Sequence, residues 1–166
     1  MRHFRIRLVV LGAAALLAGC SSADSPAGVA AADPGLNAKG LVFVAPDGFE
    51  ERPAQKLYYH PTLRASIKAA HQVGAEFEKV ASGFTKENLL KEGMELEERT
   101  TETVDGRETL FLKTRRIKAP YPQTCVISVF PTVDGCAQFV AFYPADSTAE
   151  VAAAIRKAIV TARYNK

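Results

Sequence analysis

The sequence predicts an α+β domain in which a mostly antiparallel sheet packs between helices. Short apolar runs, separated by turn residues, follow one another in the order strands, helix, four strands, helix. Asp105-Gly106 joins two β-type runs, which is a strong hairpin signal because both central residues of a type I′ turn need a positive φ. A helical period closes the chain. We therefore expect the helices on the faces of the sheet.

Three β-type runs precede the middle helix. The first, 40–44, is closed by the turn signature Pro46-Asp47-Gly48, and the second, 56–60, is stopped by Pro61. The third run, 63–70, alternates apolar and polar residues, which favours a strand, although a helix stays open there.

A helix is predicted over 75–92 because its apolar residues recur at helical spacing. Gly83 should break it into two pieces. Thr85 can cap the second piece and Gly93 can end it.

Four strands should follow as a meander, over 94–104, 107–117, 125–130 and 136–143. The first of them is mostly Glu and Thr, so we expect it to have a wet face or to lie at an edge of the sheet. The last two are the most apolar and should form the core.

The chain closes with a predicted helix over 148–163. Ser147 and Glu150 have the spacing of a capping box at its start. Ile155 and Ile159 lie on its apolar face, which we expect to pack on the sheet.

The N-terminus has the features of a lipoprotein export signal. Three arginines precede an apolar run, 8–17, that is too short to span a bilayer. The following Leu17-Ala18-Gly19-Cys20 resembles the lipobox of bacterial lipoproteins. This resemblance implies that 1–19 are a signal peptide and that Cys20 is the lipidated first residue, carrying the acyl chains that anchor the protein in a membrane.

Residues 20–40 contain the lipidated Cys and a small, polar, Pro- and Gly-dotted flexible tether, and 41–166 are expected to form a single α+β domain. In the lipoproteins that this segment resembles, a serine such as Ser21 after the cysteine is permissive for transfer to the outer membrane, so in a Gram-negative host the domain should face the periplasm. The whole chain has 21 Lys and Arg against 18 Asp and Glu, and three of the arginines lie in the signal peptide. The mature chain therefore has no net charge, so its charge gives no reason to expect nucleic-acid binding.

The order of elements looks like the PsbP-like α/β/α sandwich, including the small envelope lipoproteins of the DcrB type. The resemblance is carried by the Gly48-Phe49 turn, the segment GFTKENLLKEG over 83–93 and the hairpin VDGRETL over 104–110. It implies an antiparallel sheet between helices and a binding or scaffolding role, not an enzyme. It supplies no functional residues, and the cysteine pair departs from it.

A disulfide between Cys125 and Cys136 is expected, because exported chains commonly pair their cysteines. In the simplest hairpin, Phe130 faces Cys136 and the two thiols lie too far apart. Pairing requires a shifted register with the turn at Phe130-Pro131. Both alternatives stay open.

No catalytic residue, cofactor or metal site is expected. His60 and His71 lack neighbours at metal-ligand spacing, and no hydrolase motif surrounds a serine. The glutamates of 94–104 are typical of a solvated edge.

Tyrosines beside prolines are the one hint of a binding surface. Tyr58 and Tyr59 form one cluster of candidate residues and Tyr121 belongs to another. The second cluster, with Arg115 and Arg116 nearby, would suit a peptide or a glycan.

The sequence therefore favours a non-enzymatic, lipid-anchored envelope protein that binds or scaffolds an envelope protein or peptide. The alternatives are an envelope hydrolase with an unrecognised site and an accessory subunit of an envelope or secretion assembly.

Overall fold

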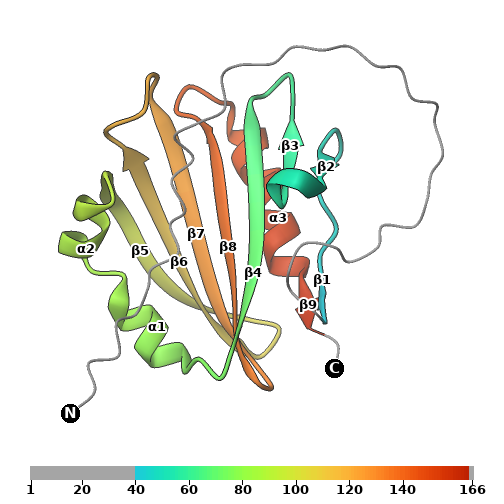
Figure 1. Ribbon diagram of the computed structural model, residues 1–166, viewed down its shortest axis with the longest axis vertical. Coiled ribbons are helices and arrows are strands. Elements are labelled where there is room, and N and C mark those ends of the chain that lie inside the picture. The colour runs from blue at the N-terminus through green and yellow to red at the C-terminus, as the bar shows by residue number, and fades with distance from the viewer. Residues whose placement is uncertain (1–39, 165–166) are drawn as a thin grey trace. The chain divides into compact units, whose positions relative to one another are not determined.

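A computed structural model describes residues 40–164, so the predicted signal peptide, Cys20 and nearly all of the tether lie outside the described residues. The described chain forms a seven-stranded antiparallel sheet in the order β2-β3-β4-β8-β7-β6-β5 (Figure 1). These strands are β2 (Glu50–Arg52), β3 (Leu57–His60), β4 (Ala65–Val73), β5 (Met94–Val104), β6 (Arg107–Arg116), β7 (Gln123–Thr132) and β8 (Gly135–Pro144).

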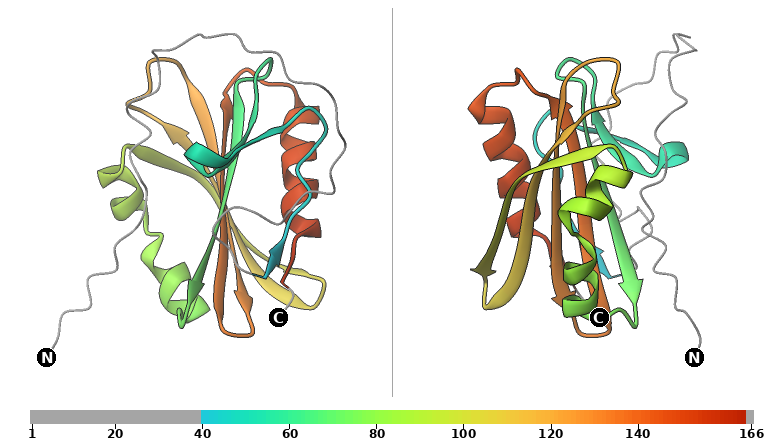
Figure 2. Two further views of the ribbon diagram at one scale, coloured as in Figure 1. Left: turned by 45° about the vertical axis from the view of Figure 1, so that its right-hand side comes forward. Right: turned by 90° about the vertical axis from the view of Figure 1, so that its left-hand side faces the viewer.

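Helices cover both faces of the sheet (Figure 2). Helix α3 (Ala149–Thr161) lies on one face, together with a two-stranded ladder of β1 (Leu41–Val42) and β9 (Arg163–Tyr164). The short helices α1 (Phe77–Gly83) and α2 (Lys86–Lys91) lie on the other face, against β5, β7 and β8. The predicted α+β fold class is confirmed.

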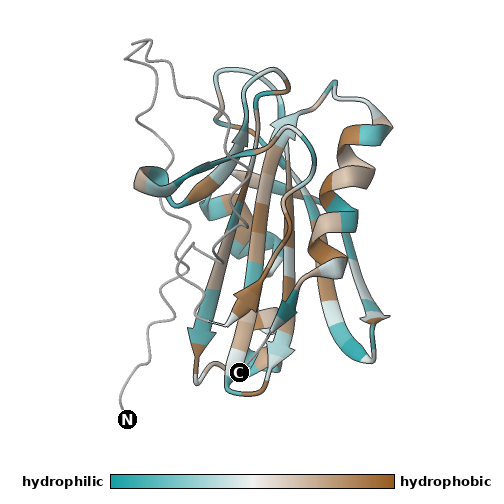
Figure 3. Ribbon diagram, turned by 90° about the vertical axis from the view of Figure 1, so that its right-hand side faces the viewer, coloured by the Kyte–Doolittle hydropathy of each residue, from teal (hydrophilic) through white to brown (hydrophobic). Residues whose placement is uncertain are grey.

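The main core lies between α3 and the sheet. Alternate residues of the strands point into it, as the apolar and polar bands along the strands show (Figure 3). Phe130 and Phe139 stack there with ring centroids 6.0 Å apart, and Ile155 and Ile159 of α3 are each 1% exposed. The predicted burial of this helix face is confirmed.

The strand assignments over 56–60 and 63–70 are confirmed by β3 and β4, so the alternation in the latter does mark a strand. The predicted break at Gly83 is also confirmed, and the Thr85 side chain accepts a hydrogen bond from the Asn88 backbone N–H at 3.1 Å. The sequence gives no signal for β2 or for the 3-10 turn η1 (Pro53–Gln55).

The predicted capping box of the last helix is wrong. The N-cap is Thr148, and no side-chain hydrogen bond caps the helix. Ser147 instead belongs to the preceding turn, where its backbone N–H donates to the Pro144 carbonyl at 3.0 Å.

The predicted disulfide is also wrong, because Cys125 and Cys136 are free and buried. Cys136 pairs with Pro131, and Cys125 pairs with Phe142. The two cysteines are therefore separated by about 20 Å along the ladder, far beyond disulfide reach. Burial raises the pKa of the Cys125 thiol to about 12 and that of the Cys136 thiol to about 11.

The antiparallel strands gather their connections at two opposite ends of the sheet. We call one the hairpin end, where the two-residue turns 105–106 and 133–134 lie. We call the other the loop end, where the connections 61–64, 117–122 and 145–148 lie. Strand β8 runs the full distance between them.

Candidate functional site

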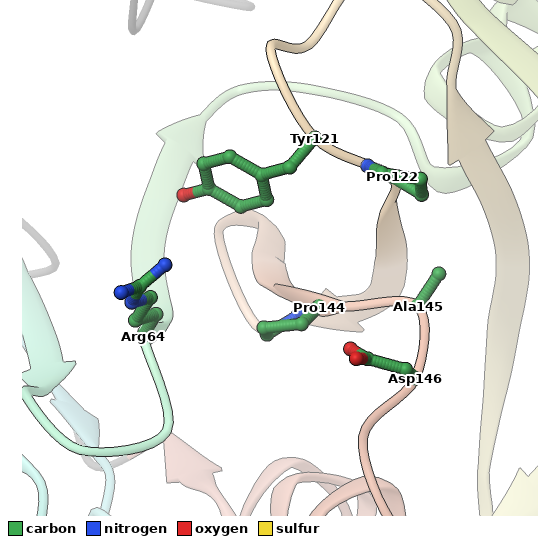
Figure 4. Close-up of a pocket in the computed structure, with 6 residues that line it drawn as sticks. All are labelled: Arg64, Tyr121, Pro122, Pro144, Ala145 and Asp146. Carbon is green, nitrogen blue, oxygen red and sulfur yellow. The ribbon is translucent and has the colours of Figure 1, made fainter.

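A hollow of about 540 Å³ lies at the loop end, and we call it the loop-end hollow (Figure 4). Three connections that are distant in sequence meet around it. Its lining residues carry one cation, one carboxylate, one phenol and otherwise apolar groups: Arg64, Tyr121, Pro122, Pro144, Ala145 and Asp146.

Arg64 is presented by the turn between β3 and β4. Its φ is 50°, in the left-handed region that residues other than glycine adopt at a cost. The turn is fixed by the Leu63 backbone N–H, which donates to His60 Nδ1 at 3.3 Å.

The His60 ring is in turn held by the Gly48-Phe49 turn. Phe49 meets it edge-on with centroids 5.4 Å apart. A Cβ at Gly48 would lie 2.5 Å from His60 Nε2, so only glycine fits beside the ring. The turn that contributes to the family resemblance therefore supports the loop carrying Arg64.

Backbone contacts join the other two connections of the hollow. The Ala145 backbone N–H donates to the Pro122 carbonyl at 3.0 Å, and the next residue pair of the ladder is Gln123 with Pro144. These contacts place Tyr121 across the hollow from Asp146 (Figure 4).

The charges in the hollow are unpaired. Within residues 40–164, neither Arg64 nor Asp146 forms an ion pair or a side-chain hydrogen bond. Figure 4 shows the Arg64 side chain on one side of Pro144 and the Asp146 carboxylate on the other. The arrangement offers two opposite charges and an apolar, partly aromatic wall to one ligand.

The structure brings only one of the five predicted binding residues to the hollow, namely Tyr121. Tyr58 is 7% exposed under the α3 face, and burial, followed by the charge of Glu51, raises its pKa. Tyr59 points to the opposite face, because consecutive strand residues alternate.

The two predicted arginines are engaged elsewhere. Arg115 forms an ion pair with Glu95, and Arg116 donates to Gln123 Oε1 at 3.0 Å. The predicted surface of Tyr58, Tyr59, Tyr121 and the arginine pair is therefore not one surface. Sequence reasoning missed Arg64, Pro144 and Asp146, because only the tertiary meeting of three loops places them beside Tyr121.

A second polar cluster lies at the hairpin end. Thr132 Oγ1 and Asp134 Oδ1 approach the same His71 nitrogen, Nε2, at 2.9 and 3.2 Å. A catalytic triad instead needs the nucleophile and the acid on different ring nitrogens. The Tyr164 hydroxyl donates to Asp134 Oδ2 at 2.9 Å, so the cluster ties the C-terminal strand to the turn 133–134.

The glutamates of β5 lie on an edge strand, as the sequence predicts for this segment, and those at 95, 97 and 102 form ion pairs. Glu95 pairs with Arg115, and Glu97 with Lys113 at 3.6 Å. Within residues 40–164 no group of acidic, His and Cys side chains has the arrangement of a metal site. The same part of the chain has no helix of sufficient length and apolarity to cross a membrane.

No protein-family model and no curated protein matches the chain. Among solved structures, it is similar to LpqN, which is involved in cell envelope biogenesis of Mycobacterium tuberculosis, with a TM-score of 0.59 and 15% identity over 76% of this chain and 83% of that one. It is also similar to the cyanobacterial PsbP, CyanoP, from Synechocystis sp., with a TM-score of 0.51 and 14% identity over 75% of this chain and 82% of that one.

A protein of unknown function from Pseudomonas aeruginosa, PA94, matches with a TM-score of 0.49 and 16% identity over 58% of this chain and 70% of that one. The likeness to LpqN and CyanoP shows the fold: the described domain is a PsbP-like sandwich.

Proposed function

We propose that this chain is a lipid-anchored cell-envelope protein with a non-enzymatic role, which binds or scaffolds an envelope component through the loop-end hollow. The anchor is Cys20. In a Gram-negative host the domain faces the periplasm from the outer membrane.

The opposite placement of the chain's entry point and the hollow carries this proposal. Residue 40 leads into β1, where Leu41 pairs with Tyr164, and Tyr164 is bonded to Asp134 in the turn at the hairpin end. The hollow lies at the other end of β8, whose ten residues span about 30 Å. A tether that joins at the hairpin end leaves the loop end free to meet a partner.

The fold supports an envelope role without specifying the ligand. LpqN, which has the same fold, is described as involved in cell envelope biogenesis. The N-terminal segment of this chain independently resembles a lipoprotein signal. The likeness to LpqN and the signal-like N-terminal segment together support the proposed envelope role.

Metabolic labelling with a fatty acid tests the anchor. The wild-type protein should incorporate the label and fractionate with membranes, whereas Cys20→Ala should remain unlabelled. A wild-type protein without label would contradict the anchoring half of the proposal.

Photocrosslinking in living cells tests the binding half. A photoreactive amino acid at Tyr121, in the hollow, should capture an envelope component. The matched control is Val133, which is 70% exposed but lies at the hairpin end. Equal capture from both positions, or capture from neither, would contradict binding at the loop end.

A further inference from the structure

We infer that the loop-end hollow takes a short peptide segment that carries both a free carboxylate and a free ammonium group, an inference that rests on the binding role proposed above.

Arg64 is exceptional among the arginines. Every other arginine of residues 40–164 has a polar or ionic partner in the structure. These are Arg52, Arg99, Arg107, Arg115, Arg116, Arg156 and Arg163. Arg64 is exposed without one, on a backbone with a φ of 50°. The guanidinium fork matches a carboxylate with two parallel hydrogen bonds, which makes a carboxylate its natural ligand.

Asp146 sets the second requirement. It lies in the same hollow, exposed and without an ion-pair partner in the described part of the chain. A purely anionic ligand on Arg64 would be repelled by this carboxylate, and a purely cationic ligand would meet the guanidinium. A neutral glycan would form a charge-assisted contact with neither group. A ligand with both charges satisfies both groups.

The wall of the hollow fits the rest of a peptide. Tyr121, Pro122, Pro144 and Ala145 supply an apolar, partly aromatic surface beside the two charges. The volume of about 540 Å³ lies within the range of small-molecule sites. Figure 4 shows Pro144 between Arg64 and Asp146, where the middle of the peptide would rest.

The first experiment titrates the full-length protein, in detergent, with the tripeptide Ala-Pro-Ala by calorimetry. The N-acetylated and C-amidated forms of the same peptide are the matched probes. The unmodified peptide should bind about tenfold more tightly than either form, because each modification removes one charge-assisted contact. Equal affinity for all three forms, or binding of none, would overturn the inference.

Two variants test which side chain of the hollow binds which charged end of the peptide. In Arg64→Gln the acid and the amide should bind equally, and in Asp146→Asn the free and acetylated amines should bind equally. Lys56→Gln is the control, since Lys56 is also exposed, has a φ of 55° and lies outside the hollow. Undiminished discrimination in both hollow variants would overturn the inference.

Two sources can supply this chemistry in an envelope: the stem peptides of the cell wall and free peptides. Co-sedimentation of the protein with purified sacculi, lost in Arg64→Gln, would support the wall as the source. Binding of Ala-Pro-Ala without sedimentation would support free peptide. Wall glycan stripped of its peptides, if it bound equally well, would overturn the inference.

This experiment separates the inference from the proposed function. Failure of the peptides to bind, with capture from Tyr121 in cells intact, would reject only the ligand class. Loss of capture in cells would reject the binding role itself.

Discussion

The hairpin end and the loop-end hollow differ in whether their charged side chains have partners. At the hairpin end, Arg163 pairs with Asp105 at 2.6 Å, and Arg107 donates to the Ala162 carbonyl at 3.0 Å. At the loop end, Arg64 and Asp146 line a hollow without a partner among the described residues.

The hairpin-end contacts hold the fold together, whereas we propose that the hollow binds a ligand. Polar groups that satisfy one another fix the C-terminal strand and, through it, β1. The exposed ion pair of Arg163 with Asp105 adds at most about 1 kcal/mol, and the unpaired charges of the hollow add no such contact to the folded domain. We therefore expect substitutions at the hairpin end to cost stability, and substitutions in the hollow to cost ligand binding.

The largest expected effect lies in the core shared by both ends. Ile155→Ala or Ile159→Ala should each lower the free energy of unfolding by about 2–5 kcal/mol, because each leaves a cavity between α3 and the sheet. Urea denaturation followed by circular dichroism measures it. A loss near zero in both variants would mean that α3 contributes little to holding the two ends together.

The next effect belongs to the hairpin end alone. A Cβ at Gly135 would lie 2.0 Å from the Gln72 carbonyl oxygen, so Gly135→Ala must push β4 and β8 apart. We expect a loss of about 3 kcal/mol. Gly83→Ala is the control, since a Cβ there meets nothing within 4 Å, and helical alanine is favoured. Equal unfolding midpoints for the two variants would contradict the expectation.

At the loop end, a substitution should instead raise the free energy of unfolding. Arg64→Gly removes the side chain from a left-handed position and should raise the free energy of unfolding by up to about 1 kcal/mol. Lys56→Gly should behave alike. Only Arg64→Gly should abolish the preference of the hollow for a peptide with a free carboxylate. A marked loss of stability in Arg64→Gly would show that Arg64 serves the fold.

A smaller, pH-dependent effect is expected for Tyr164→Phe. Burial, followed by the hydrogen bond to Asp134, raises the pKa of Tyr164 above its ordinary value of 10.0. The stabilisation is complete below that pH and is lost as the pH rises through the folded-state pKa, because the unfolded chain ionises first. The difference in urea midpoint between wild type and variant should therefore be constant up to about pH 9 and shrink as the pH rises further, through the folded-state pKa. A difference in midpoint that did not change with pH would mean that the Tyr164 hydroxyl does not help to hold β9 to the turn 133–134.

The smallest expected effect concerns the cysteines, one toward each end. Cys125 pairs with Phe142 near the loop end, and Cys136 pairs with Pro131 near the hairpin end. A reductant should therefore leave the unfolding midpoint unchanged. Alkylation of the unfolded, unreduced protein should modify both residues, as read by peptide mass spectrometry. If neither cysteine were alkylated, the result would show that the two form a disulfide.

Local signals in the sequence predict most of the fold. The Asp105-Gly106 turn forms with φ of 50° and 74°, as a type I′ hairpin needs. The meander and the apolar face of α3 follow from periodicity alone. Strand β2 was missed because its three residues, Glu50–Arg52, are exposed and carry no apolar pattern.

The candidate site was less predictable, because loops that are distant in sequence build it. Tyr121 was found through its flanking prolines. Arg64 sits beside a strand where an exposed arginine is unremarkable, and Asp146 resembles any turn residue. The β7–β8 register differs from both sequence alternatives by placing Pro131, rather than Phe130 or Cys125, opposite Cys136.

The short ladder of β1 and β9 has a mechanical consequence. Only two pairs, Leu41 with Tyr164 and Val42 with Arg163, join these strands. A pull on the residues before Leu41 has only these two pairs to break before β1 comes free, whereas a load on the hollow is shared by the long ladders that join β4, β8 and β7. In the anchored, ligand-binding protein proposed above, tension between anchor and ligand would therefore detach β1 first. It would draw Leu41 and Phe43 out of the core before the seven-stranded sheet yields.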